Sequence, residues 1–346
     1  MAVTLDGELV VDIWGGHRDA ARQVPWTADT ITNVWSTTKT MTNLCALVLA
    51  DRGELSLDAP VARYWPEFAA GGKDAVEVRH LLAHTAGLSG WTEPISIDDL
   101  YDWEKATGLL AGQEPWWEPG TQSGYHAVTQ GYLVGEVVRR VTGQSLGTFF
   151  AENLAGPLGA DFHIGLPASE DHRVAPVLPP PSAELAAVTS DIALRTLGNP
   201  QLSAETSWDR SWRGAEVPAA NGHGNARSVV AVQSALACGG EVGGVRILSP
   251  AGCEAVFREQ SYGTDLVLGV PMRLGIGYGL ISPEIPLSPN ERACFWGGWG
   301  GSVILNDLDA RMCVAYMMNK MESGLTGDLR GASIIFAAHE AVAAVA

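Results

Sequence analysis

Strand-like patterns lie at both ends of this chain of 346 residues and fade in its middle, which limits the folds it can adopt. At the start, Ala2–Leu5 and Glu8–Trp14 alternate around Asp6-Gly7, a typical two-residue hairpin turn. A short strand is predicted at Thr30–Val34. The remaining strand-like runs are Tyr278–Ser282, Cys294–Trp296, Ser302–Asn306 and Arg311–Asn319. A sheet built from these runs joins distant parts of the chain.

Helical patterns interrupted by Pro and Gly fill the middle of the chain, which contains a proline-rich linker at residues 178–181. This order predicts an α+β fold, in which an antiparallel sheet is flanked by helices and carries a helical insertion. We expect residues 1–55 and 220–346 to form a discontinuous sheet domain. Residues 56–219 are expected to form the helical insertion domain.

The composition excludes several classes of function. Hydrophobic residues make up 46% of the chain and charged residues 18%, which is typical of a folded globular protein. The formal net charge of −17 repels phosphate backbones and anionic lipids, so we expect neither nucleic acid nor a membrane as partner. The first residues lack the basic and apolar regions of a signal peptide, which predicts a cytoplasmic protein. The five cysteines are scattered and predict no zinc site.

Two patterns that could carry chemistry are interpreted as structural. The segment Gly143–Gly147 matches Gly-x-Ser-x-Gly, but a nucleophile elbow needs a preceding strand and the preceding residues have helical spacing. Gly143 is therefore expected to end one helix and Ser145 to cap the next. His80 and His84 have zinc-binding spacing, but no glutamate lies between them and no third ligand is evident.

A third pattern is Ser36-Thr37-Thr38-Lys39. Ser36 stands where a predicted strand ends and a buried helix begins, so its N–H lies at the positive end of that helix. Lys39 lies one turn further on, on the same face. An amine in apolar surroundings loses solvation of its charged form and can accept the serine proton. The motif alone leaves open a simple N-cap serine beside a solvated lysine.

With further segments in the same order, the motif resembles the serine β-lactamase and penicillin-binding-protein superfamily. The resemblance is closest to the class-C-like branch that holds the family VIII carboxylesterases and related acyltransferases, and it implies a β-lactamase-like fold. The segments that carry it are Val34–Thr42, Gly53–Val61, Val78–Leu88, Trp117–Tyr125 and Phe295–Ser302. They extend over nearly the whole chain.

The resemblance implies catalytic roles for three side chains. Ser36 would attack the acyl carbon, Lys39 would act as the base, and Tyr125 would exchange protons with the serine and the leaving group. The backbone N–H groups of Ser36 and Trp299 would form the oxyanion hole. The resemblance implies neither a metal nor a cofactor.

Two departures from the family pattern bear on the substrate. Ala127 stands in place of the asparagine of Tyr-x-Asn, and Trp296-Gly297-Gly298 replaces Lys-Thr-Gly. Both changes remove polar groups that hold penicillin-like or D-Ala-D-Ala substrates, and Trp-Gly-Gly resembles the esterase and acyltransferase branch. The residues expected near the substrate are Trp296, Gly297, Gly298, Trp299, His126 and Trp117.

We therefore predict a serine hydrolase that cleaves small-molecule carboxylic esters through an acyl-Ser36 intermediate. The alternatives are a β-lactamase or D-amino-acid peptidase of the same superfamily and, from another class, a non-catalytic relative that binds a ligand. The sequence leaves open acyl transfer to an alcohol or amine, and homo-oligomer formation. Family members usually begin with a helix before the first strand. We expect either that this sequence is shortened or that a predicted helix at Ala332–Ala346 covers the sheet face alone.

Overall fold

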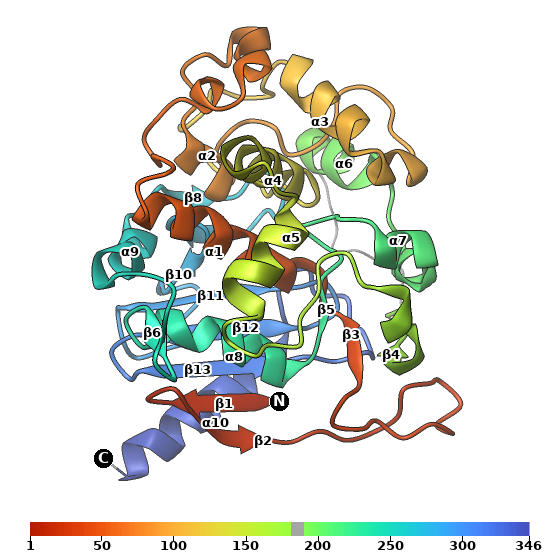
Figure 1. Cartoon of the computed structure of the whole chain (residues 1–346), viewed down its shortest axis with the longest axis vertical. Helices are drawn as coiled ribbons and strands as arrows, with labels where there is room; N and C mark the ends of the chain where they lie inside the picture. Colours follow the sequence, from red (N-terminus) through yellow and green to blue (C-terminus); the bar gives the residue numbers. More distant parts are fainter. Residues whose placement is uncertain (181–189, 346) are drawn as a thin grey trace.

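The computed structural model describes residues 1–180 and 190–345, and Figure 1 shows a large sheet with helices gathered around it. The sheet has eight strands in the order β2-β1-β13-β12-β11-β10-β9-β8, and all neighbours are antiparallel. The strands are β1 (Ala2–Leu5), β2 (Glu8–Asp12), β8 (Ser261–Thr264), β9 (Pro271–Leu274), β10 (Gly279–Leu280), β11 (Ala293–Gly297), β12 (Val303–Asp307) and β13 (Met312–Tyr316). The first strands of the chain therefore pair with its last.

Helices of the middle of the chain stand on the side of the molecule away from β1 and β2 (Figure 1). The α-helices are α1 (Thr38–Asp51), α2 (Val78–Leu82), α3 (Trp103–Gly112), α4 (Thr129–Thr142), α5 (Leu146–Phe150), α6 (Asp191–Gly198), α7 (Arg210–Gly214), α8 (Ala226–Ala237), α9 (Pro250–Glu254) and α10 (Leu329–Val345). Helix α1, which follows the N-terminal strands, packs against α4 and α5 from the middle of the chain.

Two helices cover opposite faces of the sheet. Asn306 of β12 donates a hydrogen bond to Gln233 of α8 at 2.9 Å, so its face of the sheet carries α8. The next residue, Asp307, lies 3.7 Å from His339 of α10. Because successive side chains of a strand point to opposite faces, α8 and α10 enclose the sheet between them. The predicted α+β fold is confirmed.

The predicted N-terminal hairpin is present. Asp6 and Gly7 both have positive φ, +51° and +83°, as a two-residue turn matched to the strand twist requires. The second strand ends at Asp12, earlier than the predicted Trp14. The helix predicted at Ala332–Ala346 begins three residues earlier, at Leu329, and Ala346 lies outside the described residues.

The strand predicted at Thr30–Val34 forms a separate small sheet. Strand β3 (Ile31–Asn33) pairs with β4 (Val174–Ala175) and β5 (His223–Gly224), segments from the middle of the chain. This small sheet fixes the approach to α1. The strands β8 and β9 were not predicted, because β8 shows no apolar alternation and β9 has only four residues.

The predicted division into a sheet domain and a helical insertion domain stays a prediction. Pro181 of the predicted linker lies outside the described residues. Among the helices that the structure describes, none has the length and apolar character needed to span a bilayer. The predicted cytoplasmic location stays a prediction.

Candidate active site

Ser36 lies on a tight turn between β3 and α1. One turn of 3-10 helix, Trp35–Thr37, precedes α1, so the α-helix begins two residues later than predicted. Trp35 has a φ of +48°, and a non-glycine residue in this region carries a strain of about 1–3 kcal/mol. Such strain is common at functional sites. Ser36 is 7% exposed, at the entrance of a helix whose residues 38–49 are all buried.

The amino group of Lys39 lies beside the Ser36 hydroxyl. Its Nζ is 3.1 Å from Ser36 Oγ and 3.0 Å from the Tyr125 hydroxyl. It also donates to the carbonyl oxygens of Ala127 at 2.7 Å and Ala219 at 3.0 Å. The side chain is completely buried, and this loss of solvation holds the Lys39 pKa well below its ordinary value of 10.5.

The Tyr125 hydroxyl contacts both Ser36 Oγ and Lys39 Nζ, so the structure brings the three predicted catalytic side chains together. Burial raises the pKa of Tyr125 above its ordinary value, and the phenol therefore keeps its proton in the resting site. The rings of His84 and Trp296 lie against the phenol, with centroid distances of 5.3 Å and 5.8 Å. These neighbours keep the phenol in a dry, aromatic environment.

The loop between β11 and β12 lies against the Ser36 turn. Ser302 Oγ donates to the Val34 carbonyl oxygen at 2.9 Å. A Cβ at Gly298 would lie 2.6 Å from that carbonyl oxygen and 3.1 Å from the Ser36 nitrogen, so this approach requires glycine. The loop that carries Trp299 is thereby held beside the Ser36 turn, and the oxyanion hole of the Ser36 and Trp299 N–H groups stays a prediction.

The other residues of the predicted Trp-Gly-Gly segment are tightly packed. A Cβ at Gly297 would lie 2.2 Å from the Thr326 carbonyl oxygen, so backbone fills the space beside this glycine. Trp296 is 3% exposed and stacks on His84. Trp299 keeps an exposed surface, and its ring lies 4.9 Å from that of Trp35. Contact of these residues with substrate stays a prediction.

Contact of His126 with the substrate stays a prediction, and the structure shows the ring bonded to the backbone. The side chain is completely buried, its Nδ1 lies 2.6 Å from the Gly124 carbonyl oxygen, and its Nε2 accepts the Leu88 N–H at 3.1 Å. Burial lowers its pKa to about 3, so the ring is neutral and serves the backbone. The sequence shows the residue type but not the direction of the side chain. Trp117 is partly exposed and lies edge-on over His126 at 5.9 Å.

The other candidate patterns have structural roles. His84 has a φ of +60° beyond the end of α2, so His80 and His84 do not share a helix face. His80 Nδ1 accepts the Glu77 N–H at 3.2 Å, and His84 Nδ1 accepts the His126 N–H at 3.1 Å. Within residues 1–180 and 190–345, no three His, Cys, Asp or Glu side chains group as metal ligands. Ser145 caps α5, as interpreted.

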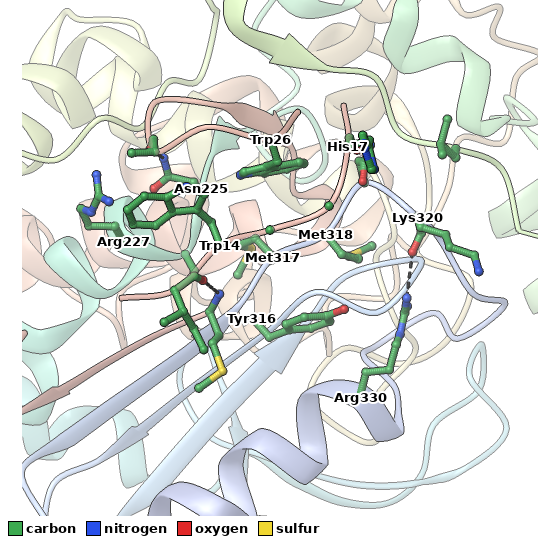
Figure 2. Close-up of a pocket in the computed structure, with 18 of the residues that line it drawn as sticks. Trp14, His17, Trp26, Asn225, Arg227, Tyr316, Met317, Met318, Lys320 and Arg330 are labelled. Carbon is green, nitrogen blue, oxygen red and sulfur yellow. Dashed lines mark hydrogen bonds between the residues drawn. The ribbon is translucent and has the colours of Figure 1, made fainter. Parts of the chain in front are cut away.

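A cavity of about 790 Å³ lies apart from the catalytic side chains (Figure 2). Trp14, Trp26 and Tyr316 lie around it, and Ser36, Lys39 and Tyr125 are not among its lining residues. Arg330 lines the cavity, and its guanidinium donates to the Lys320 carbonyl (dashed in Figure 2) and to the Gly300 carbonyl. This cavity is therefore distinct from the candidate active site.

One buried carboxylate beside the site was not predicted. Asp265 follows β8, is 1% exposed, and accepts the Tyr125 N–H at 2.9 Å. The two residues are 140 positions apart in the sequence, and the hairpin that carries Asp265 has a weak strand pattern. No signal in the sequence joins them.

The fold and the serine–lysine–tyrosine cluster define a serine-dependent hydrolase of the β-lactamase-like class. The family model described as Beta-lactamase matches residues 1–338, and the chain therefore belongs to the beta-lactamase family. This confirms the predicted resemblance and the predicted class of serine hydrolase.

Several relatives are similar over most of their length. The esterase/beta-lactamase LipL of Mycobacterium tuberculosis is 36% identical over 94% of this chain and 77% of its own. The crystal structure of a family VIII carboxylesterase is 48% identical, with a TM-score of 0.92 over 98% of this chain and 91% of its own. A penicillin-binding protein homologue from Caulobacter crescentus is 40% identical, with a TM-score of 0.93 over the same shares.

Proposed function

We propose that this protein hydrolyses small-molecule carboxylic esters through an acyl-Ser36 intermediate. The observation that carries the proposal is the buried amine of Lys39, 3.1 Å from Ser36 Oγ and 3.0 Å from the Tyr125 hydroxyl. A serine hydroxyl is a weak nucleophile until a neighbouring base removes its proton. Lys39 is that base, because burial favours its neutral form.

The partners of Lys39 suit a neutral amine with one lone pair. The carbonyl oxygens of Ala127 and Ala219 can only accept hydrogen bonds, so they take both N–H groups of the neutral amine. The one lone pair is then left for the Ser36 hydroxyl, while the Tyr125 hydroxyl donates to Ser36 Oγ. The arrangement leaves the base free to accept a proton from the nucleophile.

Acylation forms the bond between Ser36 Oγ and the acyl carbon while the hydroxyl proton moves to Lys39. The N–H groups of Ser36 and Trp299 bind the developing oxyanion, and one such donor contributes a factor of about 10²–10³ to turnover. Tyr125 passes its proton to the leaving alcohol as the ester C–O bond breaks, and it regains a proton from Lys39. Water then attacks the acyl-Ser36 ester by the same proton route and releases the acid.

Esters are favoured over β-lactams and D-peptides by two residues. Ala127 carries no side-chain amide to hold a substrate amide, and Trp296 carries no cation to meet a substrate carboxylate. The proposal is further supported by the similarity to a family VIII carboxylesterase at 48% identity and to the esterase EstB of Burkholderia gladioli, 32% identical over half of this chain. LipL, which is named for both activities, keeps the β-lactamase alternative worth testing.

The experiment is a comparison of kcat/KM on p-nitrophenyl butyrate, on nitrocefin and on a D-Ala-D-Ala peptide, with Ser36→Ala as the control. We expect the ester to be the preferred substrate and Ser36→Ala to be inactive on it. Nitrocefin turnover comparable with ester turnover would favour a β-lactamase. Failure of a fluorophosphonate probe to label Ser36 would favour the non-catalytic alternative, and product esters formed with added alcohols would show acyl transfer.

A further inference from the structure

The loop between β8 and β9 carries a buried carboxylate that reaches the main chain of Tyr125. Asp265 Oδ1 accepts three N–H groups, those of Tyr125, Val267 and Leu268, each at 2.9 Å. The same loop holds the neighbouring segment a second time, because the Leu266 N–H donates to the Ser123 carbonyl oxygen at 2.9 Å. The hairpin is therefore joined to the segment that carries the catalytic phenol.

Asp265 shapes its own loop, but this role does not explain all of its hydrogen bonds. The bonds from the N–H groups of Val267 and Leu268 form a local turn of the kind that Asp makes with the residues after it. The bond from Tyr125 is additional and joins two distant segments. Hydrogen bonds to an ionised, buried carboxylate are about twice as strong as neutral ones, so this bond is a firm anchor.

Three successive N–H groups of the tyrosine segment are held by side or main chain. The Gly124 N–H donates to the His84 carbonyl oxygen at 3.0 Å, and the His126 N–H donates to His84 Nδ1 at 3.1 Å. The Tyr125 N–H between them is the one held by Asp265, a charged group. Tyr125 lies outside any helix or strand, so these anchors replace the ladder bonds that would otherwise fix it.

We propose that Asp265 is a positioning residue for Tyr125, whose carboxylate fixes the tyrosine main chain so that the phenol stays in contact with Ser36 and Lys39. The inference rests on the proposed function, in which Tyr125 carries protons. The negative charge has a second effect, because a carboxylate near the phenol disfavours the phenolate and adds to the effect of burial on the Tyr125 pKa. The other titratable groups that face the phenol are Lys39 and His84.

Two substitutions separate the anchor from the charge. Asp265→Ala removes both, and we expect kcat on an alkyl ester to fall by about 10²-fold at nearly constant KM, the cost of a misplaced catalytic group. Asp265→Asn keeps an acceptor oxygen, so most of kcat should return.

Asp307→Ala is the matched control. Asp307 is also completely buried and accepts hydrogen bonds from Ser288, Asn290 and Ala310, but it is the last residue of β12. This variant should lose stability without slowing catalysis per titrated active site. An equal fall in kcat for the two alanine variants would overturn the proposal.

Hydrogen exchange at single amides supplies a readout that does not need activity. In Asp265→Ala the Tyr125 amide should exchange at least tenfold faster, with smaller changes at the Gly124 and His126 amides that His84 holds. Unchanged protection of the Tyr125 amide would overturn the positioning role, whatever the reactivity of Ser36. An unreactive Ser36 in the wild type would instead overturn the proposed function. If Asp265→Ala does not fold, Asp265→Asn takes its place, because a neutral acceptor bonds the Tyr125 N–H more weakly. Unchanged protection of the Tyr125 amide in that variant would overturn the proposal.

Discussion

Two lysines of this protein are completely buried, and they differ in the groups around the amine. Lys73 Nζ donates to three backbone carbonyl oxygens, those of Ala70 at 2.7 Å, Ala111 at 3.0 Å and Gln113. Lys39 Nζ has two carbonyl oxygens and two hydroxyl groups as partners. Three pure acceptors match the three donors of an ammonium group, whereas two carbonyl acceptors leave the lone pair of a neutral amine for the Ser36 hydroxyl.

The comparison shows that burial alone does not make a lysine catalytic. Loss of solvation lowers the pKa of both side chains, to about 8 for Lys73 and well below 10.5 for Lys39. At Lys73 the partners hold the end of α3 to the segment before α2, which is a structural task. At Lys39 the same lowering of the pKa gives a neutral amine, and this amine lies beside the Ser36 hydroxyl as a base beside a nucleophile.

The largest expected loss of activity comes from replacing Lys39, and the same replacement at Lys73 should cause none. Lys39→Met removes the base and should lower kcat/KM on p-nitrophenyl butyrate by about 10³–10⁴-fold, the upper range for general base catalysis. Lys73→Met, the same change at a buried site of the other kind, should leave kcat per titrated active site unchanged. Comparable losses in both variants would remove the distinction on which the account rests.

Tyr125→Phe should give the next largest loss of activity, and it tests the role of one hydroxyl partner of Lys39. The variant keeps the ring but cannot protonate a leaving alcohol, so kcat on an ethyl ester should fall by about 10²–10³-fold. The p-nitrophenyl ester should lose less, because its leaving group departs without a proton. A ratio of the two rates that matches the wild type would argue against proton transfer by Tyr125.

The pH dependence of activity tests the neutral form of Lys39. Because only the neutral amine accepts the serine proton, kcat/KM should rise with pH as Lys39 loses its proton, by up to about tenfold per pH unit on the acid limb. The lowered pKa places this limb well below 10.5, and activity should be high by mildly alkaline pH. A profile from pH 6 to 10 with an acidic optimum would contradict the assignment.

The smallest expected effect is on stability at Lys73. Its folded-state pKa of about 8 lies below the ordinary value of 10.5, so the unfolded chain binds more protons between these values. The free energy of unfolding of the wild type should therefore rise with pH across this window relative to Lys73→Met. Denaturant titrations at pH 8 and pH 10 measure this difference, and parallel curves for the two proteins would count against a buried, titrating amine.

The proximity of residues close together in the sequence was predictable. Contacts that depend on the packing of distant segments were not. Ser36 and Lys39 are one helical turn apart, so their proximity followed from the sequence. Tyr125 was found through resemblance to a family motif, since nothing in the local pattern joins it to α1. The burial of His126 was not predictable, because the direction of a side chain depends on its packing. Asp265 was missed because it follows a strand, β8, without apolar alternation and lies 140 positions from Tyr125 in the sequence.

The central claim is that Ser36 becomes acylated with Lys39 as its base, and mass spectrometry tests it most directly. Wild type and Lys73→Met, quenched during turnover of an activated ester, should both gain the mass of the acyl group on the peptide that contains Ser36. Ser36→Ala should gain none, and Lys39→Met should accumulate the adduct far more slowly. Full ester turnover by Ser36→Ala, or an acyl adduct on a different residue, would contradict the account.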